Sequence, residues 1–150
     1  MDENSEILID KGIKPTKMRI GILQFLMLQD TAVGLQNIRA AFLKNRFPKK
    51  LANRTTFYRV VKKFEEKGIV HRIDDGTGTI KFAISKKEND VHMHLHCINC
   101  NTTKCLENQI SKESLPRGYE IAEINMVIKG FCKKCQKKEQ LEIVLKSSSF

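Results

Sequence analysis

Four cysteines of the chain form two CxxC pairs, Cys97–Cys100 and Cys132–Cys135, which are separated by 31 intervening residues. Each pair can place two thiolates on one tetrahedral ion, and zinc is the metal that such pairs prefer. A closed four-thiolate site leaves no open position for a substrate, so we expect a structural role for it. A redox CxxC and buried, unliganded cysteines are the alternatives.

Three histidines alternate along the chain just before the first pair, in His92-Met-His94-Leu-His96-Cys97. On a β-strand, residues two apart share a face, so the histidines would point to one side and Cys97 to the other. One strand could therefore serve two metal sites.

Cys105 and His71 complete the set of cysteines and histidines. If His71, His92, His94 and Cys105 met, they would form a nitrogen-rich site with one soft thiolate. Such a site suits tetrahedral zinc better than octahedral magnesium or manganese. The alternatives are a small buried side chain for Cys105, and a solvated side chain or a phosphate contact for His71.

The charge of the chain favours a polyanionic partner. Its 150 residues contain 27 Lys and Arg against 17 Asp and Glu, which gives a net charge of +10. Asp30 is the one acidic residue between Lys11 and Lys63, a stretch with 13 basic residues. A solvated surface normally mixes its signs, so this stretch predicts nucleic-acid binding.

The composition also bears on localisation. No apolar run approaches the roughly 20 residues that span a membrane, and the acidic N-terminus lacks the features of a signal or transit peptide. We therefore expect a cytoplasmic protein that does not bind membranes. In that reducing compartment, metal ligation is a better use for five cysteines than disulfides.

Helical spacing of apolar residues dominates the chain up to about Phe64. We expect helices over residues 4–11 and 15–29, a third between Gly34 and Pro48, and a fourth that begins near Asn53 or Thr55 and ends at Gly68. In the fourth helix, one apolar stripe separates from a polar and basic face. The stripe consists of Phe57, Val60, Val61 and Phe64.

A hairpin is predicted after this helix, with strands over residues 69–73 and 79–84 joined by a Gly-rich turn. Helices followed by a two-stranded hairpin form a winged helix-turn-helix domain, here residues 1–84. The third helix of that motif enters the major groove of DNA. A helical domain with an attached hairpin and no such role is the alternative.

The polar segment 85–90 is expected to be a hinge or linker, and residues 91–150 a second domain. In that domain we expect the His/Cys strand, a short helix at 111–114, a strand over 118–129 and a final helix over 134–146. The fold class is α+β.

Four segments together resemble the ferric uptake regulator family of bacterial metal-dependent repressors: KGIKPTKMRIGIL, RTTFYRVVKKFEEKGIVHRI, HMHLHCINC and FCKKC. The resemblance runs from about Lys11 to Leu145. It implies a homodimer with winged-helix domains, a hinge and C-terminal α/β dimerisation domains that hold structural zinc.

The resemblance also implies roles for individual residues. Tyr58 and Arg59 match the pair that contacts bases and phosphates. The expected DNA-binding residues are Lys14, Arg19, Arg54, Thr55, Thr56, Tyr58 and Arg59. The expected structural zinc ligands are Cys97, Cys100, Cys132 and Cys135.

For the regulatory site, His92 and His94 match the HxH of the family, and His71 lies where some zinc-responsive members have a hinge ligand. Cys105 replaces the Asp or Glu that several members carry. The resemblance leaves open whether His96 is a further ligand.

Departures from the family pattern favour zinc. Ala32 and Ala83 stand near positions where iron-responsive members supply a histidine and a glutamate, and Val91 and Met93 replace residues of an accessory third site. We expect zinc to act as corepressor, closing the dimer onto a palindromic operator that controls metal-uptake genes.

Two other functions are alternatives to this one. An iron- or peroxide-responsive repressor would use Fe(II) or Mn(II) at the regulatory site. A zinc hydrolase would need an open metal position and a positioned base. Glu88 and Asp90 are the only nearby acids, and they lie in the expected linker. We therefore expect no enzymatic activity and no small-molecule substrate.

Overall fold

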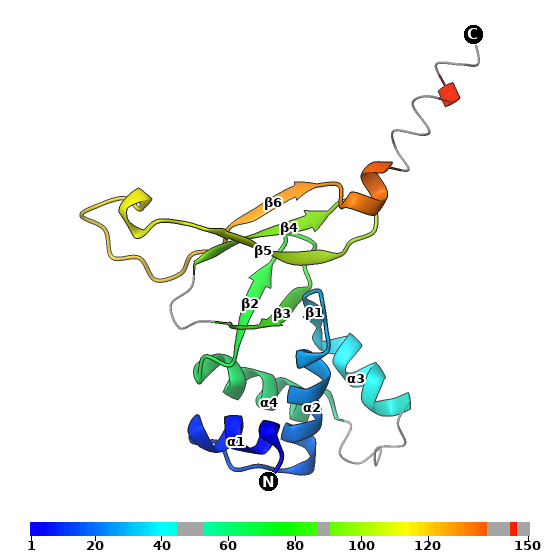
Figure 1. The fold of residues 1–150 in the computed structure, drawn as a ribbon, viewed down its shortest axis with the longest axis vertical. Coiled ribbons are helices and arrows are strands. Elements are labelled where there is room, and N and C mark those ends of the chain that lie inside the picture. The colour runs from blue at the N-terminus through cyan, green and yellow to red at the C-terminus, as the bar shows by residue number, and fades with distance from the viewer. Residues whose placement is uncertain (45–52, 87–90, 138–144, 147–150) are drawn as a thin grey trace. The chain divides into compact units, whose positions relative to one another are not determined.

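A computed structural model describes residues 1–44, 53–86, 91–137 and 145–146. The chain divides into two compact units, Met1–Asp90 and Val91–Phe150 (Figure 1). The described part of the chain contains no helix that is long and apolar enough to cross a membrane.

Four helices make up most of the first unit: α1 (Glu3–Asp10), α2 (Lys17–Met27), α3 (Leu35–Lys44) and α4 (Arg54–Glu66). Three of them begin at a side chain that accepts a hydrogen bond from a first-turn amide. These capping residues are Asp2, Thr16 and Asn53. All four helices lie where the helical spacing of the sequence predicts them.

The boundaries of α4 follow from its capping residues. Asn53 Oδ1 accepts a hydrogen bond from the Thr55 amide at 3.0 Å, so Asn53 is the N-cap among the two candidates. At the other end, Gly68 has a φ of +71°, a conformation that costs glycine little and ends the helix. The expected end of α3 near Pro48 lies outside the described residues.

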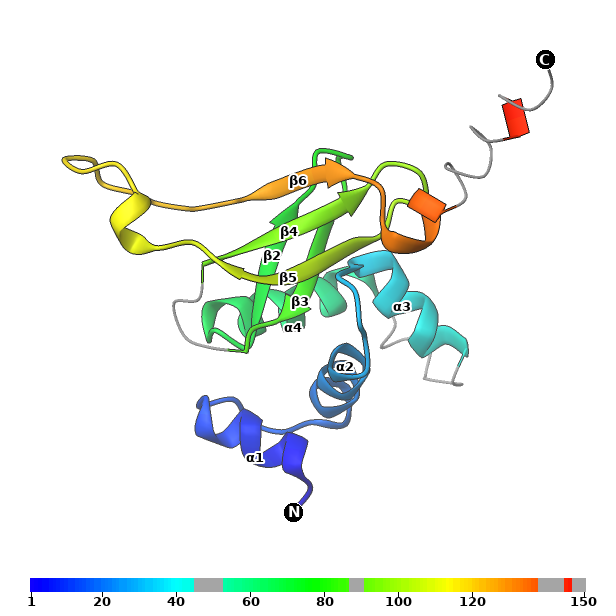
Figure 2. The same cartoon turned by 45° about the horizontal axis from the view of Figure 1, so that its top comes forward.

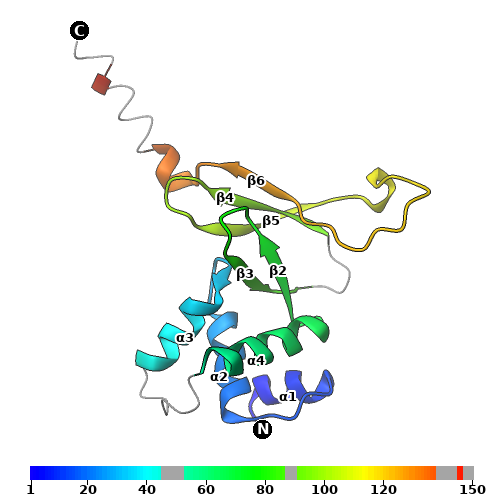
Figure 3. The ribbon, with the colours of Figure 1, turned by 180° about the vertical axis from the view of Figure 1, so that it is seen from behind.

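The predicted hairpin is present as β2 (Val70–Asp74) and β3 (Ile80–Ile84), with Arg72 opposite Phe82. A third strand, β1 (Val33–Gly34), adds to the outer side of β3, so the sheet order is β1-β3-β2. The order of elements, α2-β1-α3-α4-β2-β3, is that of a winged helix. Figure 3 shows the chain passing from α4 directly into β2.

The core of the first unit is built around the apolar stripe of α4. Phe57, Val60, Val61 and Phe64 are all buried, as the spacing predicts. Phe42 of α3 meets Phe57 edge to face, with ring centroids 5.4 Å apart. Burying each such side chain contributes roughly 1.5–3 kcal/mol, which holds α4 with its basic face toward solvent.

The second unit is a three-stranded sheet with the order β5-β4-β6 (Figure 2). Its strands are β4 (His92–Cys97), β5 (Thr103–Gln109) and β6 (Val127–Gly130). β5 runs antiparallel to β4, whereas β6 runs parallel to it. The short helix predicted at 111–114 is present as a 3₁₀ helix, η1 (Lys112–Ser114), with Ser111 as its N-cap.

The predicted strand over residues 118–129 is wrong in its length. Only Val127–Gly130 is a strand, because these residues pair in parallel register with β4, while residues 118–126 form no strand, although the Met126 carbonyl accepts a hydrogen bond from the His94 amide at 3.0 Å. Of the final helix predicted over 134–146, residues 134–137 and 145–146 are helical, the observed helix beginning one residue earlier at 133, and 138–144 lie outside the described residues. Residues 87–90 of the expected linker also lie outside them.

The wing turn supplies a test of the first unit. Asp75 is buried, and its carboxylate forms an ion pair with Lys81 Nζ at 2.9 Å. It also accepts a hydrogen bond from the Thr77 amide at 3.1 Å. Asp75→Ala leaves these donors without their acceptor, so we expect the free energy of unfolding to fall by about 1–3 kcal/mol in urea titrations.

The neighbouring Asp74→Ala is the matched control, because Asp74 accepts an exposed hydrogen bond from the Gly76 amide. Its expected loss is below about 1 kcal/mol. Equal losses for the two variants would contradict the role given to the buried carboxylate.

Candidate functional sites

The two CxxC pairs meet at one end of the second sheet. Because β6 is parallel to β4 and Gly130 pairs with Cys97, Cys132 follows two residues later beside the first pair. The Ile98 amide donates to the Gly130 carbonyl at 2.9 Å and extends this alignment.

The sulfur atoms of Cys97, Cys100, Cys132 and Cys135 all lie within 4.8 Å of one another. Cys100 and Cys132 Sγ are 3.9 Å apart. A tetrahedral zinc with Zn–S bonds of about 2.3 Å requires sulfurs about 3.8 Å apart, so the spacing fits this ion.

Local hydrogen bonds prepare part of this cluster for ionisation. The backbone amides of Cys100 and then Cys132 lower the pKa of Cys97 to about 6. The Thr102 hydroxyl and amide lower the pKa of Cys100. Thiolates are the form that binds metal, so the backbone around the first pair favours ligation.

The last thiol shows why the cluster needs a cation. The Asn99 side chain acts to lower the pKa of Cys135, but the Cys132 thiol, burial and the other two cysteines together raise it to about 11. Four negative sulfurs cannot share one small volume without a positive charge among them. A divalent metal supplies that charge.

A second group of ligand atoms lies on the adjacent strands β4 and β5. His94 pairs with Cys105 across the two strands, and the ligand atoms of His92, His94 and Cys105 lie within 4.8 Å of one another. The His92 and His94 rings are 4.5 Å apart between centroids. β4 therefore contributes ligand atoms to both groups, as the alternation of its residues predicts.

A hydrogen bond determines which nitrogen of the His94 ring carries the proton. Its Nδ1 lies 3.2 Å from the Met126 carbonyl oxygen, which can only accept, so we assign the proton to Nδ1. Nε2 is then left as the lone pair for a metal. Burial, followed by the charge of His92, lowers the pKa of His94, so the ring is neutral near pH 7.

The other two histidines are placed differently. His96 is buried, its Nδ1 lies 2.9 Å from Thr103 Oγ1, and it belongs to neither group of ligand atoms found in the described residues. His71 lies on β2 of the first unit, with its Nδ1 3.2 Å from Ser85 Oγ. The contact of the Met126 carbonyl with His94 could not be predicted from the sequence, because every residue has a backbone carbonyl and its residue type does not mark it.

The expected DNA-binding residues lie on two parts of the first unit. Arg54, Thr55, Tyr58 and Arg59 are exposed on α4, and Thr56 is half-buried there. The Lys62 ammonium lies 5.9 Å from the centre of the Tyr58 ring, a cation–π contact that the sequence prediction did not include.

Lys14 lies in the segment just before α2, and Arg19 lies in the first turn of α2. Lys14 is exposed, whereas Arg19 is half-buried and its Nη1 donates to the Lys14 carbonyl at 2.8 Å. Arg19 therefore braces the turn that carries Lys14. Sequence reasoning could not separate these two roles, since both residues are simply basic.

A winged helix with a basic exposed face, followed by a sheet with two groups of side chains that could hold a metal ion, is the arrangement of a metal-binding DNA-binding protein. Comparison with known proteins agrees. The chain belongs to the ferric uptake regulator family, whose model matches residues 10–129.

Relatives in this family match almost the whole chain. The ferric uptake regulation protein of Bordetella parapertussis is 31% identical over 143 residues, which cover 91% of this chain and 99% of the relative. That of Legionella pneumophila is 31% identical over 140 residues, covering 89% and 99%.

Solved structures show the same fold. The Pseudomonas aeruginosa ferric uptake regulator with manganese has a TM-score of 0.62 and 26% identity, covering 89% of this chain and 99% of that one. A zinc uptake regulator complexed with zinc and DNA has a TM-score of 0.69 and 16% identity, covering 93% and 99%.

Membership settles the class of function. Proteins of this family are metal-responsive, DNA-binding repressors that act as dimers, and they are not enzymes. The zinc hydrolase alternative is thereby excluded. The α+β fold, with an N-terminal DNA-binding and a C-terminal dimerisation domain, is confirmed.

The cysteine cluster can be tested by metal retention. Cys100→Ser removes one of four thiolates, so we expect the purified protein to lose a zinc ion that resists mild chelation and to unfold at lower temperature. Elemental analysis before and after chelation, with thermal unfolding, measures both effects.

Cys105→Ser is the matched control, because Cys105 belongs to the other group of ligand atoms. It should leave the chelation-resistant zinc in place. Loss of that zinc from Cys105→Ser, or its retention by Cys100→Ser, would contradict the assignment.

Proposed function

We propose that this protein is a zinc-responsive repressor of metal-uptake genes. The observation that carries the proposal is the group formed by His92, His94 and Cys105 in the second unit. Two imidazoles and a thiolate favour zinc over metals that prefer oxygen ligands, and a carboxylate at position 105 would favour harder ions.

His71 is proposed as the fourth ligand. It lies on β2 opposite Ala83 of β3, and its Nδ1 is 3.2 Å from the Oγ of Ser85, the first residue of the linker 85–90, a contact that restricts the ring. A metal held by His71 and by the second-unit group would join the DNA-binding domain, residues 1–84, to the dimerisation domain, residues 91–150. His96 has a lesser claim, since its Nδ1 faces Thr103.

The residues of the first unit would then read the operator. Tyr58 and Arg59 of α4 would contact bases and phosphates in the major groove. Arg54, Thr55 and Thr56, at the start of α4, would also contact the DNA. Lys14, braced by Arg19, would contact the backbone. A dimer presents two such helices, so the operator would be palindromic, with half-sites about 34 Å or a multiple of it apart.

Regulation requires that the closed, DNA-binding form binds zinc more tightly than the open form. A coupling of about 1–3 kcal/mol between the metal and DNA would make binding respond to zinc. The four cysteines Cys97, Cys100, Cys132 and Cys135 would hold a separate zinc that supports folding. The protein would act in the cytoplasm.

A second candidate is a repressor that responds to Fe(II) or Mn(II), including a peroxide-responsive one. It is favoured by the names of the relatives, which are ferric uptake regulation proteins, and by the structural neighbour that contains manganese. The metal that restores DNA binding separates the two candidates.

The first test is a metal titration. Protein stripped by mild chelation should regain tight, specific DNA binding with Zn(II), and at equal site occupancy Fe(II) and Mn(II) should restore less. Fluorescence anisotropy with a duplex selected by the protein from a random library measures this. Restoration by Fe(II) alone would refute the zinc proposal.

The second test changes the ligands. Cys105→Ala and His94→Ala should each remove the metal dependence of DNA binding, with the chelation-resistant zinc retained. Cys105→Asp replaces the soft thiolate with a hard carboxylate ligand. The metal preference of the site should therefore shift from Zn(II) toward Fe(II) and Mn(II).

His71→Ala tests the fourth ligand separately, because His71 lies in the other unit. We expect this substitution to weaken the binding of the removable zinc. It should also reduce the response of DNA binding to zinc. An unchanged metal titration for His71→Ala would exclude His71, while leaving the second-unit group intact.

A further inference from the structure

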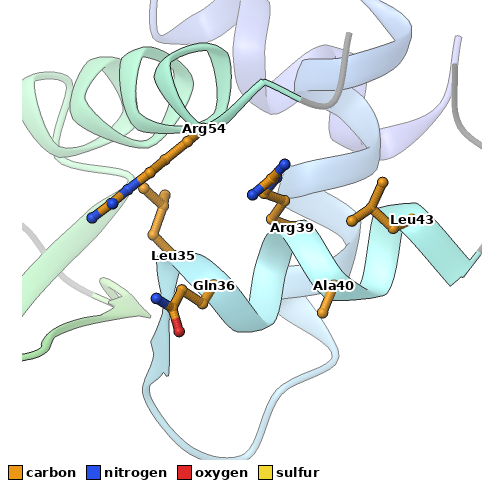
Figure 4. Close-up of a pocket in the computed structure, with 6 residues that line it drawn as sticks. All are labelled: Leu35, Gln36, Arg39, Ala40, Leu43 and Arg54. Atoms are coloured by element: carbon orange, nitrogen blue, oxygen red, sulfur yellow. The ribbon is translucent and has the colours of Figure 1, made fainter. Parts of the chain in front are cut away.

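A cavity of about 300 Å³ lies between α3 and the start of α4 in the first unit. It is lined by Leu35, Gln36, Arg39, Ala40, Leu43 and Arg54. Figure 4 shows Arg39 reaching from α3 toward the start of α4, and Arg54 extending from α4 past Leu35. Two arginine side chains from different helices therefore line one cavity.

The chemistry of the cavity is positive and amphipathic. None of its six lining residues is acidic, and the sequence contains no Asp or Glu from residue 31 to residue 64. Beside the two arginines, the walls are formed by apolar side chains and the Gln36 amide. This combination suits a ligand with an anionic part and a less polar part.

The cavity adjoins the face of α4 that is expected to read DNA. Arg54 and Tyr58 are four residues apart and thus share one face of the helix, which continues to Lys62. In helix-turn-helix proteins the helix before the recognition helix crosses the DNA backbone. Here that helix is α3, which carries Arg39.

We propose that this cavity seats one phosphodiester of the DNA backbone, with Arg39 and Arg54 contacting its phosphate. The attached deoxyribose would lie against Leu35, Ala40 and Leu43. Arg39 is then a DNA-contacting residue outside the recognition helix, and the contact positions α4 without reading bases. The inference rests on the proposed DNA-binding role of the first unit.

The experiment uses the full-length, metal-loaded protein and measures dissociation constants across a range of salt concentrations. The two probes are a duplex selected by the wild-type protein from a random library and an unrelated duplex of equal length. Arg39→Gln and Arg54→Gln should each weaken binding to both duplexes by about tenfold at fixed salt. Each should also reduce the salt slope by about one.

Two further variants keep the result interpretable. Arg39→Lys retains the charge, so its salt slope should match that of the wild type. Arg117→Gln removes one exposed arginine from the second unit and should leave the slope unchanged. Thermal unfolding of every variant shows whether a loss of binding reflects a loss of folding.

The outcomes distinguish the cavity from the wider function. A normal salt slope for Arg39→Gln, or a slope lowered equally by Arg117→Gln, would overturn the phosphate site. A changed preference between the two duplexes would also overturn it, because it would indicate a base contact. Failure of the wild-type protein to bind either duplex would instead refute the proposed function itself.

Discussion

The hydrogen-bond register of β4 is the constraint on which both groups of metal ligands depend. Its antiparallel partner β5 brings Cys105 opposite His94, and its parallel partner β6 brings Cys132 to the end where Cys97 lies. A slip of one residue would turn every side chain of β4 to the other face. Two distinct ligand groups on one short strand therefore require a single, well-defined pairing.

Burial plays the corresponding part in the first unit. The apolar stripe of α4 packs against α3 and the sheet, and that packing leaves the opposite face to solvent. Tyr58, Arg59 and Lys62 are presented there because Phe57, Val61 and Phe64 are held inside. The cavity lined by Arg39 and Arg54 lies between the same two helices, α3 and α4.

Family membership and ligand chemistry answer different questions about this chain. The family model and the relatives establish a metal-responsive repressor fold. The choice of metal depends instead on a few donor atoms. In the group of His92, His94 and Cys105, the Cys105 sulfur is the donor that distinguishes it from a site with only nitrogen and oxygen donors. A thiolate and two imidazoles bind a softer ion than carboxylates do.

Local patterns in the sequence determined the helices and most of their boundaries, the hairpin, the two CxxC pairs and the alternating histidines, because caps, periodicity and ligand spacing act over a few residues. Only the tertiary structure decided what depends on distant partners. It added β1, shortened the strand expected over 118–129 to the four residues that pair with β4, and engaged His96 with Thr103. It also brought the Met126 carbonyl to His94, and Arg39 and Arg54 to one cavity. These contacts join residues of different secondary-structure elements, and the pattern within one element does not encode which residue of another it meets.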